Sequence, residues 1–357
     1  MTWEFTDDVH AYARRTWPLL AADPAGNTVA LTVIENLRAG RRRSSGPMTF
    51  GWFTSGKLAV GAVSMTPPYE LLLAEVPTPT IAPLADASAA RGVVVTGVNG
   101  ETGAAEAFAI AWTSHRPARA VPRREQRLYK LDILLPTRPA GGRSRPAVPG
   151  DVHLATDWFT RFQVEAGSHA VDVEPVVRHC IEDQLLWLWE DGGQPVSMAG
   201  RNSTAAGVAR IGPVYTPTEH RRRGYGAAIT GACTSDALSR GAHDVVLFTD
   251  LANPTSNAPT RRSASAPCAI TWSSSSRSAE APKRARHPGH NLQLLRKWNG
   301  LRHRSGRRRD DWTALIKFSQ ADGQRSGEGP GGHDEDEGLC GAQNREGLLQ
   351  LSLTLKK

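Results

Sequence analysis

The 357-residue chain has few cysteines, no long apolar run and no secretion signal. Its four cysteines stand far apart and form no Cys-x-x-Cys pair, which argues against a zinc site and a disulfide framework and favours reduced thiols. No apolar stretch approaches the roughly 18 residues of a membrane-spanning helix. The start, MTWEFTDDVH, is acidic where a secretion signal would be basic and then apolar. The sequence therefore predicts a cytoplasmic protein without a membrane partner.

The formal charge of +8 is confined to the last hundred residues. Residues 1–257 carry 25 lysines and arginines against 25 aspartates and glutamates, and residues 258–357 carry 18 against 10. A nucleic-acid partner would therefore have to bind residues 258–357, where the run RKWNGLRHRSGRRRDDW could contact a phosphate backbone by charge alone. Neither aromatic interleaving nor a helical pattern supports that function, so nucleic acid is the less favoured partner.

Two domains of similar organisation are expected. Proline, glycine and arginine are concentrated in residues 136–150, which predicts a linker. Before it, residues 1–135 predict two helices, three strands, a helix, a strand, a helix and a strand. Residues 151–257 begin the same order again, from two helices through three strands to a helix and a strand. We expect an α/β (α+β) fold in two tandem copies, each a mixed central sheet flanked by helices.

Turn and cap residues predict where these elements end. Residues 8–40 have helical spacing of apolar residues, and Pro18 and Pro24 are expected to divide them into separate helices. The run VVVTGV, residues 93–98, predicts a buried strand. Glycines predict hairpin turns at Ser55-Gly56 and Gly192-Gly193, and helix ends at Gly92 and Gly241.

A short glycine- and arginine-rich segment, PTEHRRRGYGA, lies between a predicted strand, 208–217, and a predicted helix, 225–242. Glycines let a backbone curl around an anion, successive N–H groups point inward, and a helix N-terminus adds partial positive charge. Arginines beside such a loop can neutralise phosphate. The segment lacks the Gly-Lys-Ser/Thr end of a Walker loop and the third glycine of the dinucleotide fingerprint. Its pattern, Arg221-x-x-Gly224-x-Gly226, therefore predicts a phosphate-binding loop of another kind.

This pattern resembles the GNAT superfamily of acyl-CoA-dependent N-acyltransferases, whose pyrophosphate loop is Gln/Arg-x-x-Gly-x-Gly/Ala. The neighbouring stretches IGPVYTP, VVLFTD and NPTSN extend the resemblance over about residues 151–257. Residues 1–135 look like the same fold without the glycine loop. The resemblance implies transfer of an acetyl or related acyl group from acetyl-CoA, as a cosubstrate, to a primary amine of an acceptor that the sequence does not identify. It implies no metal.

The resemblance also implies which residues bind acetyl-CoA. The backbone around Val214 and Tyr215 would align the pantetheine arm and polarise the thioester carbonyl, and the loop would hold the pyrophosphate. The full set expected to contact acetyl-CoA is Val214, Tyr215, Arg221, Arg222, Arg223, Gly224, Tyr225, Gly226, Ala227 and Asn253.

The general base and the general acid stay unassigned. Glu219, His220 and Asp250 lie near the expected site in sequence, and Glu165 could face the acceptor amine. Each also has a simpler interpretation: Glu219 and His220 as solvated loop residues, Asp250 as a strand end and Glu165 as a helix surface position. The arginine triplet could equally be a solvated charge run, although its place before Gly-x-Gly favours phosphate contact.

Residues 258–357 depart from the family, which continues through a helix carrying a tyrosine acid into two closing strands. Here the position of that tyrosine falls near Thr260, periodicity is lost and apolar residues are scarce, which predicts a disordered tail. A one-base shift of the reading frame near Ala258 would explain the change. A non-catalytic acyl-CoA-binding module therefore remains an alternative to the enzyme, because binding can survive the loss of the acid and the strands.

Overall fold

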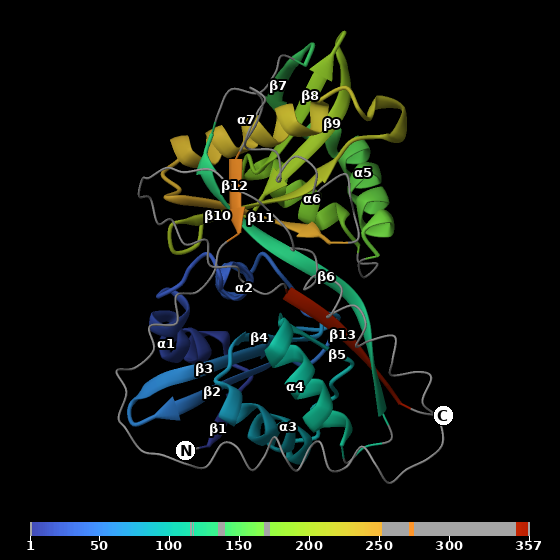
Figure 1. Cartoon of the computed structure of the whole chain (residues 1–357). Coiled ribbons are helices and arrows are strands. Elements are labelled where there is room, and N and C mark those ends of the chain that lie inside the picture. The colour runs from blue at the N-terminus through green and yellow to red at the C-terminus, as the bar shows by residue number, and fades with distance from the viewer. Residues whose placement is uncertain are drawn as a thin grey trace, which may run out of the picture. The chain divides into compact units, whose positions relative to one another are not determined.

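The computed structural model describes residues 2–114, 116, 118–134, 140–167, 172–251, 271–274 and 348–355 (Figure 1). All of these residues belong to the same structural unit. Within it, two sets of helices and strands follow each other along the chain in the same order, and strand β6 lies between them in sequence. The duplication of element order that the sequence predicts is therefore present in the fold.

The first set has β-α-α-β-β-β-3₁₀-α-β order and is followed by a helix and β6. Its elements are β1 (Trp3–Thr6), α1 (Val9–Leu20), α2 (Thr28–Arg38), β2 (Thr49–Ser55), β3 (Leu58–Met65), β4 (Leu71–Glu75), η1 (Thr78–Thr80), α3 (Ile81–Ala90), β5 (Gly97–Glu101), α4 (Thr102–Thr113) and β6 (Ala118–Ile133). The predicted turn at Gly56 and the predicted helix end at Gly92 are confirmed, with φ of +63° and +69°.

Two boundaries in this set differ from the sequence prediction. Pro18 lies inside the last turn of α1, where it removes a single backbone donor, and the helix does not end there. The strand expected at residues 93–98 begins only at Gly97, because the N–H of Val93 donates to the carbonyl of Ser88 and completes the end of α3.

The second set repeats the same order. Its elements are β7 (Arg143–Pro146), η2 (Pro149–Asp151), α5 (Val152–Glu165), α6 (Glu174–Glu182), β8 (Leu186–Asp191), β9 (Gln194–Arg201), β10 (Val208–Tyr215), η3 (Thr218–His220), α7 (Tyr225–Ser239) and β11 (Asp244–Asp250). The linker interpretation of residues 136–150 does not hold for β7, which pairs with β8 from Arg143↔Glu190 to Pro146↔Trp187. A four-residue edge strand ending in proline has too few apolar residues for its sequence to signal a strand.

The strands of both sets pair in the same way. The order is β1-β2-β3-β4-β5 in the first and β7-β8-β9-β10-β11 in the second. All neighbours are antiparallel except the last pair of each set, β4 with β5 and β10 with β11, which is parallel. Strand β6 is antiparallel to β11 from Lys130↔Val246 to Gln126↔Asp250. These pairings confirm the predicted mixed sheets flanked by helices.

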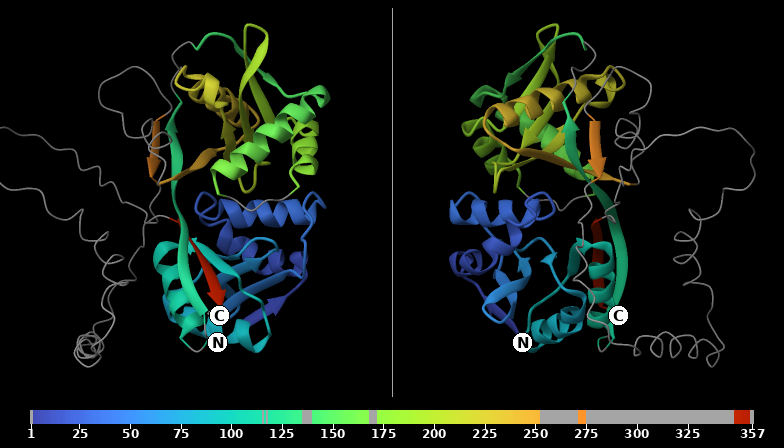
Figure 2. Two further views of the ribbon diagram at one scale, coloured as in Figure 1. Left: turned by 90° about the vertical axis from the view of Figure 1, so that its right-hand side faces the viewer. Right: turned by 60° about the vertical axis from the view of Figure 1, so that its left-hand side comes forward.

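Two further strands come from the segment 258–357. Strand β12 (Thr271–Ser274) pairs with the end of β6, and β13 (Leu348–Leu355) is antiparallel to both β5 and β6 (Figure 2). The prediction of a disordered tail does not hold for these two stretches. The rest of that segment lies outside the described residues. The hypothesis of a reading-frame shift near Ala258 stays a prediction.

Helix α7 and the pair α5–α6 cover opposite faces of the second sheet. Side chains of α7, among them Ile229 and Cys233, are buried against Ala199 and Ala209 of β9 and β10. On the other face, residues of α5 and α6 pack against the neighbouring strand positions, in a cluster that includes Trp158, Val177, Met198 and Tyr215. The alternation of strand side chains fixes α7 on one face, so its first turn lies beside the end of β10.

Arg145 of β7 fixes the start of α5. Its guanidinium donates to Asp151 Oδ2 at 2.6 Å, to Asp151 Oδ1 at 3.0 Å and to Glu190 Oε1 at 2.6 Å. Asp151 also accepts from the backbone N–H of Val148 at 2.7 Å. The hydrogen bonds from Arg145 hold the pKa of the Asp151 carboxyl below its ordinary value.

We therefore expect Asp151→Asn to destabilise the protein at neutral pH by about 1.5–3 kcal/mol, the usual range for a hydrogen bond to a charged group. The contribution is complete above the unfolded pKa of aspartate, about 4, and is lost as pH falls through the lowered folded value. Urea unfolding at pH 7 and at pH 3 measures the difference. Asp157→Asn, in an exposed pair with Arg161, is the control with little effect. An effect of Asp151→Asn that does not shrink at pH 3 would contradict the assignment.

Candidate functional site

The candidate site begins where the parallel strands β10 and β11 separate. They pair from Val208↔Asp244 to Ile211↔Leu247. Beyond this point β10 continues to Tyr215 without a strand partner on its β11 side among the described residues. On its other side, β10 changes register with β9 between Ile211 and Val214. The backbone of the predicted residues Val214 and Tyr215 therefore lines an open strand edge.

The loop after β10 leads into α7 through two residues with positive φ. Arg222 has φ of +65° and Gly224 has φ of +86°, both in the left-handed region, so the chain reverses direction twice before α7. Gly224 is the N-cap of α7 and supplies no side-chain cap. The first helical bond runs from Ala228 N to Gly224 O at 3.0 Å. The N–H groups of residues 225–227 consequently have no helical acceptor, and the helix dipole adds partial positive charge there.

The two glycines of the loop have different physical roles. Gly224 has open space around it, since an added Cβ would lie 3.8 Å from the nearest atom, Ala140 Cβ, and its need for glycine comes from its φ. Gly226 is helical, and an added Cβ would lie 3.4 Å from Oγ1 of Thr216. A side chain at residue 226 would therefore fill the space between the start of α7 and the end of β10. The loop and its space fit an anionic phosphate group.

Hydrogen bonds from the β8–β9 hairpin, buried or partly buried, hold both ends of the loop. Tyr225, 5% exposed, donates its hydroxyl to Asp191 at the end of β8. This hydrogen bond raises the pKa of Tyr225 above its ordinary value. The hydroxyl of Ser197 in β9 donates to the Tyr215 carbonyl at 3.1 Å and lies 2.8 Å from the Thr216 hydroxyl. The loop is thus anchored before any ligand binds.

Arg221 is turned toward the end of α5. Its Nε donates to the carbonyl of Thr216 at 2.8 Å, and its Nη2 lies 2.8 Å from both carboxylate oxygens of Glu165. The guanidinium carbon lies 5.9 Å from the centre of the Tyr215 ring. The side chains of Arg221 and Glu165 are 41% and 49% exposed, so water screens the pair and its exchange for another anion costs little. No sequence pattern pairs Arg221 with Glu165, and the fold brings the two side chains together.

The remaining sequence candidates are scattered around the loop. Arg222, Arg223 and Glu219 are exposed. His220 is half-buried, and its Nδ1 has no hydrogen-bond partner among the described residues. Asp250 ends β11 with its carboxylate 3.5 Å from Arg124 Nε. Asn253 and Thr260 lie outside the described residues.

Sequence reasoning did not find Asp191, Ser197 or Thr216. Asp191 opens the Asp-Gly-Gly turn of the β8–β9 hairpin, and a carboxylate at a turn is ordinary in a hairpin. Ser197 and Thr216 are small polar residues at strand positions, which no pattern distinguishes. Their function as loop anchors depends on contacts between strands and α7 that are far apart in sequence.

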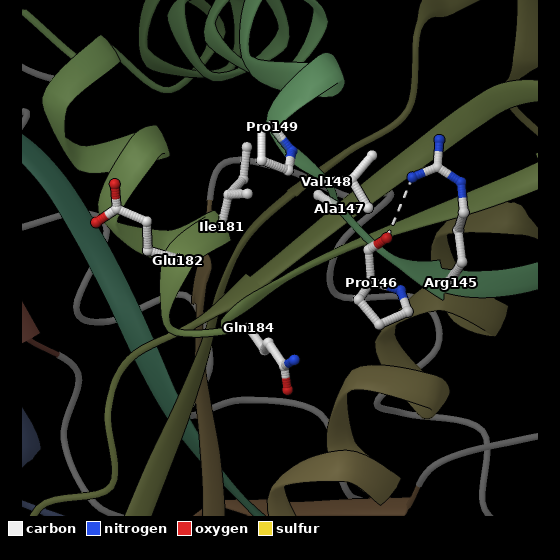
Figure 3. A pocket seen from close by; sticks show the side chains of 8 residues that line it. All are labelled: Arg145, Pro146, Ala147, Val148, Pro149, Ile181, Glu182 and Gln184. Carbon is white, nitrogen blue, oxygen red and sulfur yellow. Dashed lines mark hydrogen bonds between the residues drawn. The ribbon is translucent and has the colours of Figure 1, made fainter.

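A cavity of about 540 Å³ lies elsewhere in the second set (Figure 3). Its walls come from the stretch between β7 and η2 and from the end of α6. The residues that line it are Arg145, Pro146, Ala147, Val148, Pro149, Ile181, Glu182 and Gln184. None of them is a predicted site residue, so the cavity is not part of the loop.

The described ranges contain neither a metal-binding cluster nor a membrane-spanning helix. There, no three histidine, cysteine, aspartate or glutamate side chains come close enough together to hold a metal ion. In the same part of the chain, every helix is too short or too polar to cross a bilayer.

Comparison with known proteins finds a family match for the second set. Residues 153–258 match the family model of the acetyltransferase (GNAT) family. No curated protein matches the chain. Among solved structures, a Drosophila protein has a TM-score of 0.55 at 11% identity, covering 76% of this chain and 95% of its own. A tandem GNAT protein from the clavulanic acid biosynthesis pathway has a TM-score of 0.47 at 14% identity, covering 72% and 92%. A GNAT family acetyltransferase from Colwellia psychrerythraea has 0.45 at 13%, covering 72% and 93%.

Proposed function

We propose that the chain transfers an acetyl group from acetyl-CoA to a primary amine, since residues 153–258 match the family model of the acetyltransferase (GNAT) family. The observation that carries the proposal is the loop between β10 and α7, where the N–H groups of residues 225–227 have no helical acceptor, Gly224 is in the left-handed region and Gly226 brings α7 close to Thr216. Family membership implies an acyl-CoA donor. The amine acceptor is our inference.

The loop would hold the pyrophosphate of the donor. The N–H groups at the start of α7 would donate to its oxygens, and Arg222 and Arg223 would add charge from the exposed side. Arg221 would act mainly as a positioning residue, because its guanidinium joins the carbonyl of Thr216 to Glu165. Asp191 would keep Tyr225, and with it the first turn of α7, in place.

The open edge of β10 would orient the thioester. Backbone groups at Val214 and Tyr215 would hydrogen-bond the pantetheine arm and polarise the acyl carbonyl. The amine nitrogen attacks the carbonyl carbon, the C–S bond breaks, and the electron pair leaves on the thiolate. The amine gives up a proton, commonly through water, and the thiolate takes one.

Calorimetry with acetyl-CoA tests this proposal. We expect Arg222→Gln/Arg223→Gln to weaken acetyl-CoA binding by about tenfold, since removing two exposed charge-assisted contacts costs on the order of 1.4 kcal/mol. Binding of S-acetylpantetheine, which has no pyrophosphate, should not change. Arg178→Gln, an exposed arginine of α6 paired with Glu174, is the control that retains affinity.

A thiol-release assay against a panel of primary amines then separates the enzyme from a binding module. Release of free thiol that depends on the amine supports transfer. Tight binding without release for every amine contradicts the enzyme and leaves the non-catalytic module. Absence of acetyl-CoA binding rejects both functions.

A further inference from the structure

Two half-buried arginines, Arg42 and Arg210, lie near the N-terminal half of β10. Arg210 is the third residue of that strand, and Arg42 follows α2, where its backbone N–H donates to the carbonyl of Asn36 at 3.2 Å. Helix α2 contacts β10, and Ala205, just before β10, packs in a cluster with residues of α1 and α2. The two side chains are close enough for the charge of one to act on the other.

Neutral groups surround both guanidinium groups. Arg42 Nη2 donates to the hydroxyl of Thr66 at 3.1 Å, and its guanidinium carbon lies 4.3 Å from the centre of the Tyr69 ring. With its amide oriented to satisfy its hydrogen bonds, Asn202 accepts from Arg210 Nε at 3.3 Å and also from Nη2. Arg210 Nη1 is buried without a partner among the described residues. One donor of the pair is therefore left for a further acceptor.

Both groups stay charged at neutral pH. Burial, together with the neighbouring charge of Arg42, lowers the pKa of Arg210 to about 10. Burial also lowers the pKa of Arg42. Because arginine does not lose its proton near neutrality, two like charges lie close together in a partly desolvated place. Such an arrangement is unfavourable unless an anion compensates it.

Several other arginines of the structure pair with carboxylates. Arg201 is paired with Asp236, Arg145 with Asp151 and Glu190, and Arg41, the neighbour of Arg42, with Asp183 at 3.9 Å. Arg42 and Arg210 have no carboxylate partner within the described part of the chain. The counter-ion of Arg42 and Arg210 is therefore not a side chain of the described residues.

We propose that Arg42 and Arg210 form a binding site for a small oxyanion, either a phosphate or the carboxylate of a ligand. The free Nη1 of Arg210 and the guanidinium of Arg42 would donate to it, and Asn202 and Thr66 hold the two side chains in place. The site lies five residues before Tyr215 on β10, about 16 Å along the strand, so it is separate from the proposed pyrophosphate loop. It extends the binding capacity of the chain beyond acetyl transfer.

Thermal unfolding in sodium phosphate, against sodium chloride of equal ionic strength, tests the site. The Gly224→Val chain is used as the parent, so that the loop does not contribute phosphate binding. We expect a saturable rise in Tm of about 2–5 °C with phosphate. Arg210→Met and Arg42→Met should each abolish the rise, and Arg43→Met, an exposed neighbour, should retain it.

A second readout distinguishes the site from a buried structural contact. If no anion is present, Arg210→Met should raise Tm in chloride, because one of two repelling charges is removed. The proposal is overturned if phosphate gives no rise in the parent, or if the rise persists in both methionine variants. Acetate and acetyl-CoA in place of phosphate identify the source: a rise with acetate indicates a carboxylate site, and a rise with acetyl-CoA that Arg210→Met abolishes indicates that the phosphates of coenzyme A bind there.

Discussion

Gly224→Val weakens acetyl-CoA binding by about 5- to 30-fold while the fold remains intact. Gly224 has φ of +86°, in the left-handed region. A non-glycine residue there costs about 1–2 kcal/mol, and a β-branched residue such as valine incurs the full cost. Relaxation of this strain moves the N–H groups of residues 225–227 away from a shared anion. Calorimetry with acetyl-CoA measures the loss, and S-acetylpantetheine should bind the variant as it binds the parent chain.

Gly241→Val is the matched control for this result. Gly241 follows the same helix, α7, at its other end with φ of +87°, and an added Cβ there meets no atom within 4 Å. The two substitutions therefore introduce the same side chain at the same backbone conformation. Both should lower Tm by similar amounts, and Gly224→Val alone should reduce acetyl-CoA affinity. An equal reduction in both variants would mean that strain in α7, and not the loop, determines binding.

Asp236→Ala destabilises the protein by about 3–5 kcal/mol, the range for removing one partner of a buried ion pair. Asp236 Oδ2 accepts from Arg201 Nε at 3.1 Å, and its Oδ1 accepts from Arg240 Nε at 2.8 Å. The side chains of Arg201 and Asp236 are only 4% and 10% exposed. The substitution leaves the Arg201 charge buried between β9 and α7 without a partner. Urea unfolding at pH 7 measures the change in free energy.

The double variant Arg201→Met/Asp236→Leu tests the cause. Because it removes both charges and keeps apolar volume, it should recover most of the lost stability. Glu174→Ala, which breaks the exposed pair with Arg178 on α6, should change the free energy of unfolding by less than about 1 kcal/mol. A double variant as unstable as Asp236→Ala would show that lost packing, and not an unpaired charge, accounts for the effect.

Local chemistry explains what the sequence could predict. Glycine is favoured where φ is positive, so Gly56, Gly92, Gly224 and Gly241 marked turns and helix ends directly. The repeated order of elements followed from apolar periodicity in each half. The glycine loop was recognisable because backbone conformation and anion binding both depend on residues adjacent in sequence.

Contacts between distant residues explain what the sequence could not predict. The pairing of Arg221 with Glu165 joins positions 56 residues apart, and Tyr225 meets Asp191 across 34 residues. Strand β7 is defined by its partner β8, because its own four residues lack an apolar pattern.

Strand β6 makes the two copies of the duplicated fold unequal. It follows the first set in sequence, yet its residues 126–130 supply the antiparallel neighbour of β11, the strand that ends beside the candidate site. The covalent boundary between the two copies therefore does not coincide with the boundary in hydrogen bonding. Excision of residues 151–257 would expose the backbone of β11 as an unprotected sheet edge, which favours self-association. The second copy therefore depends on β6, which follows the first copy in sequence, to cover the edge of β11.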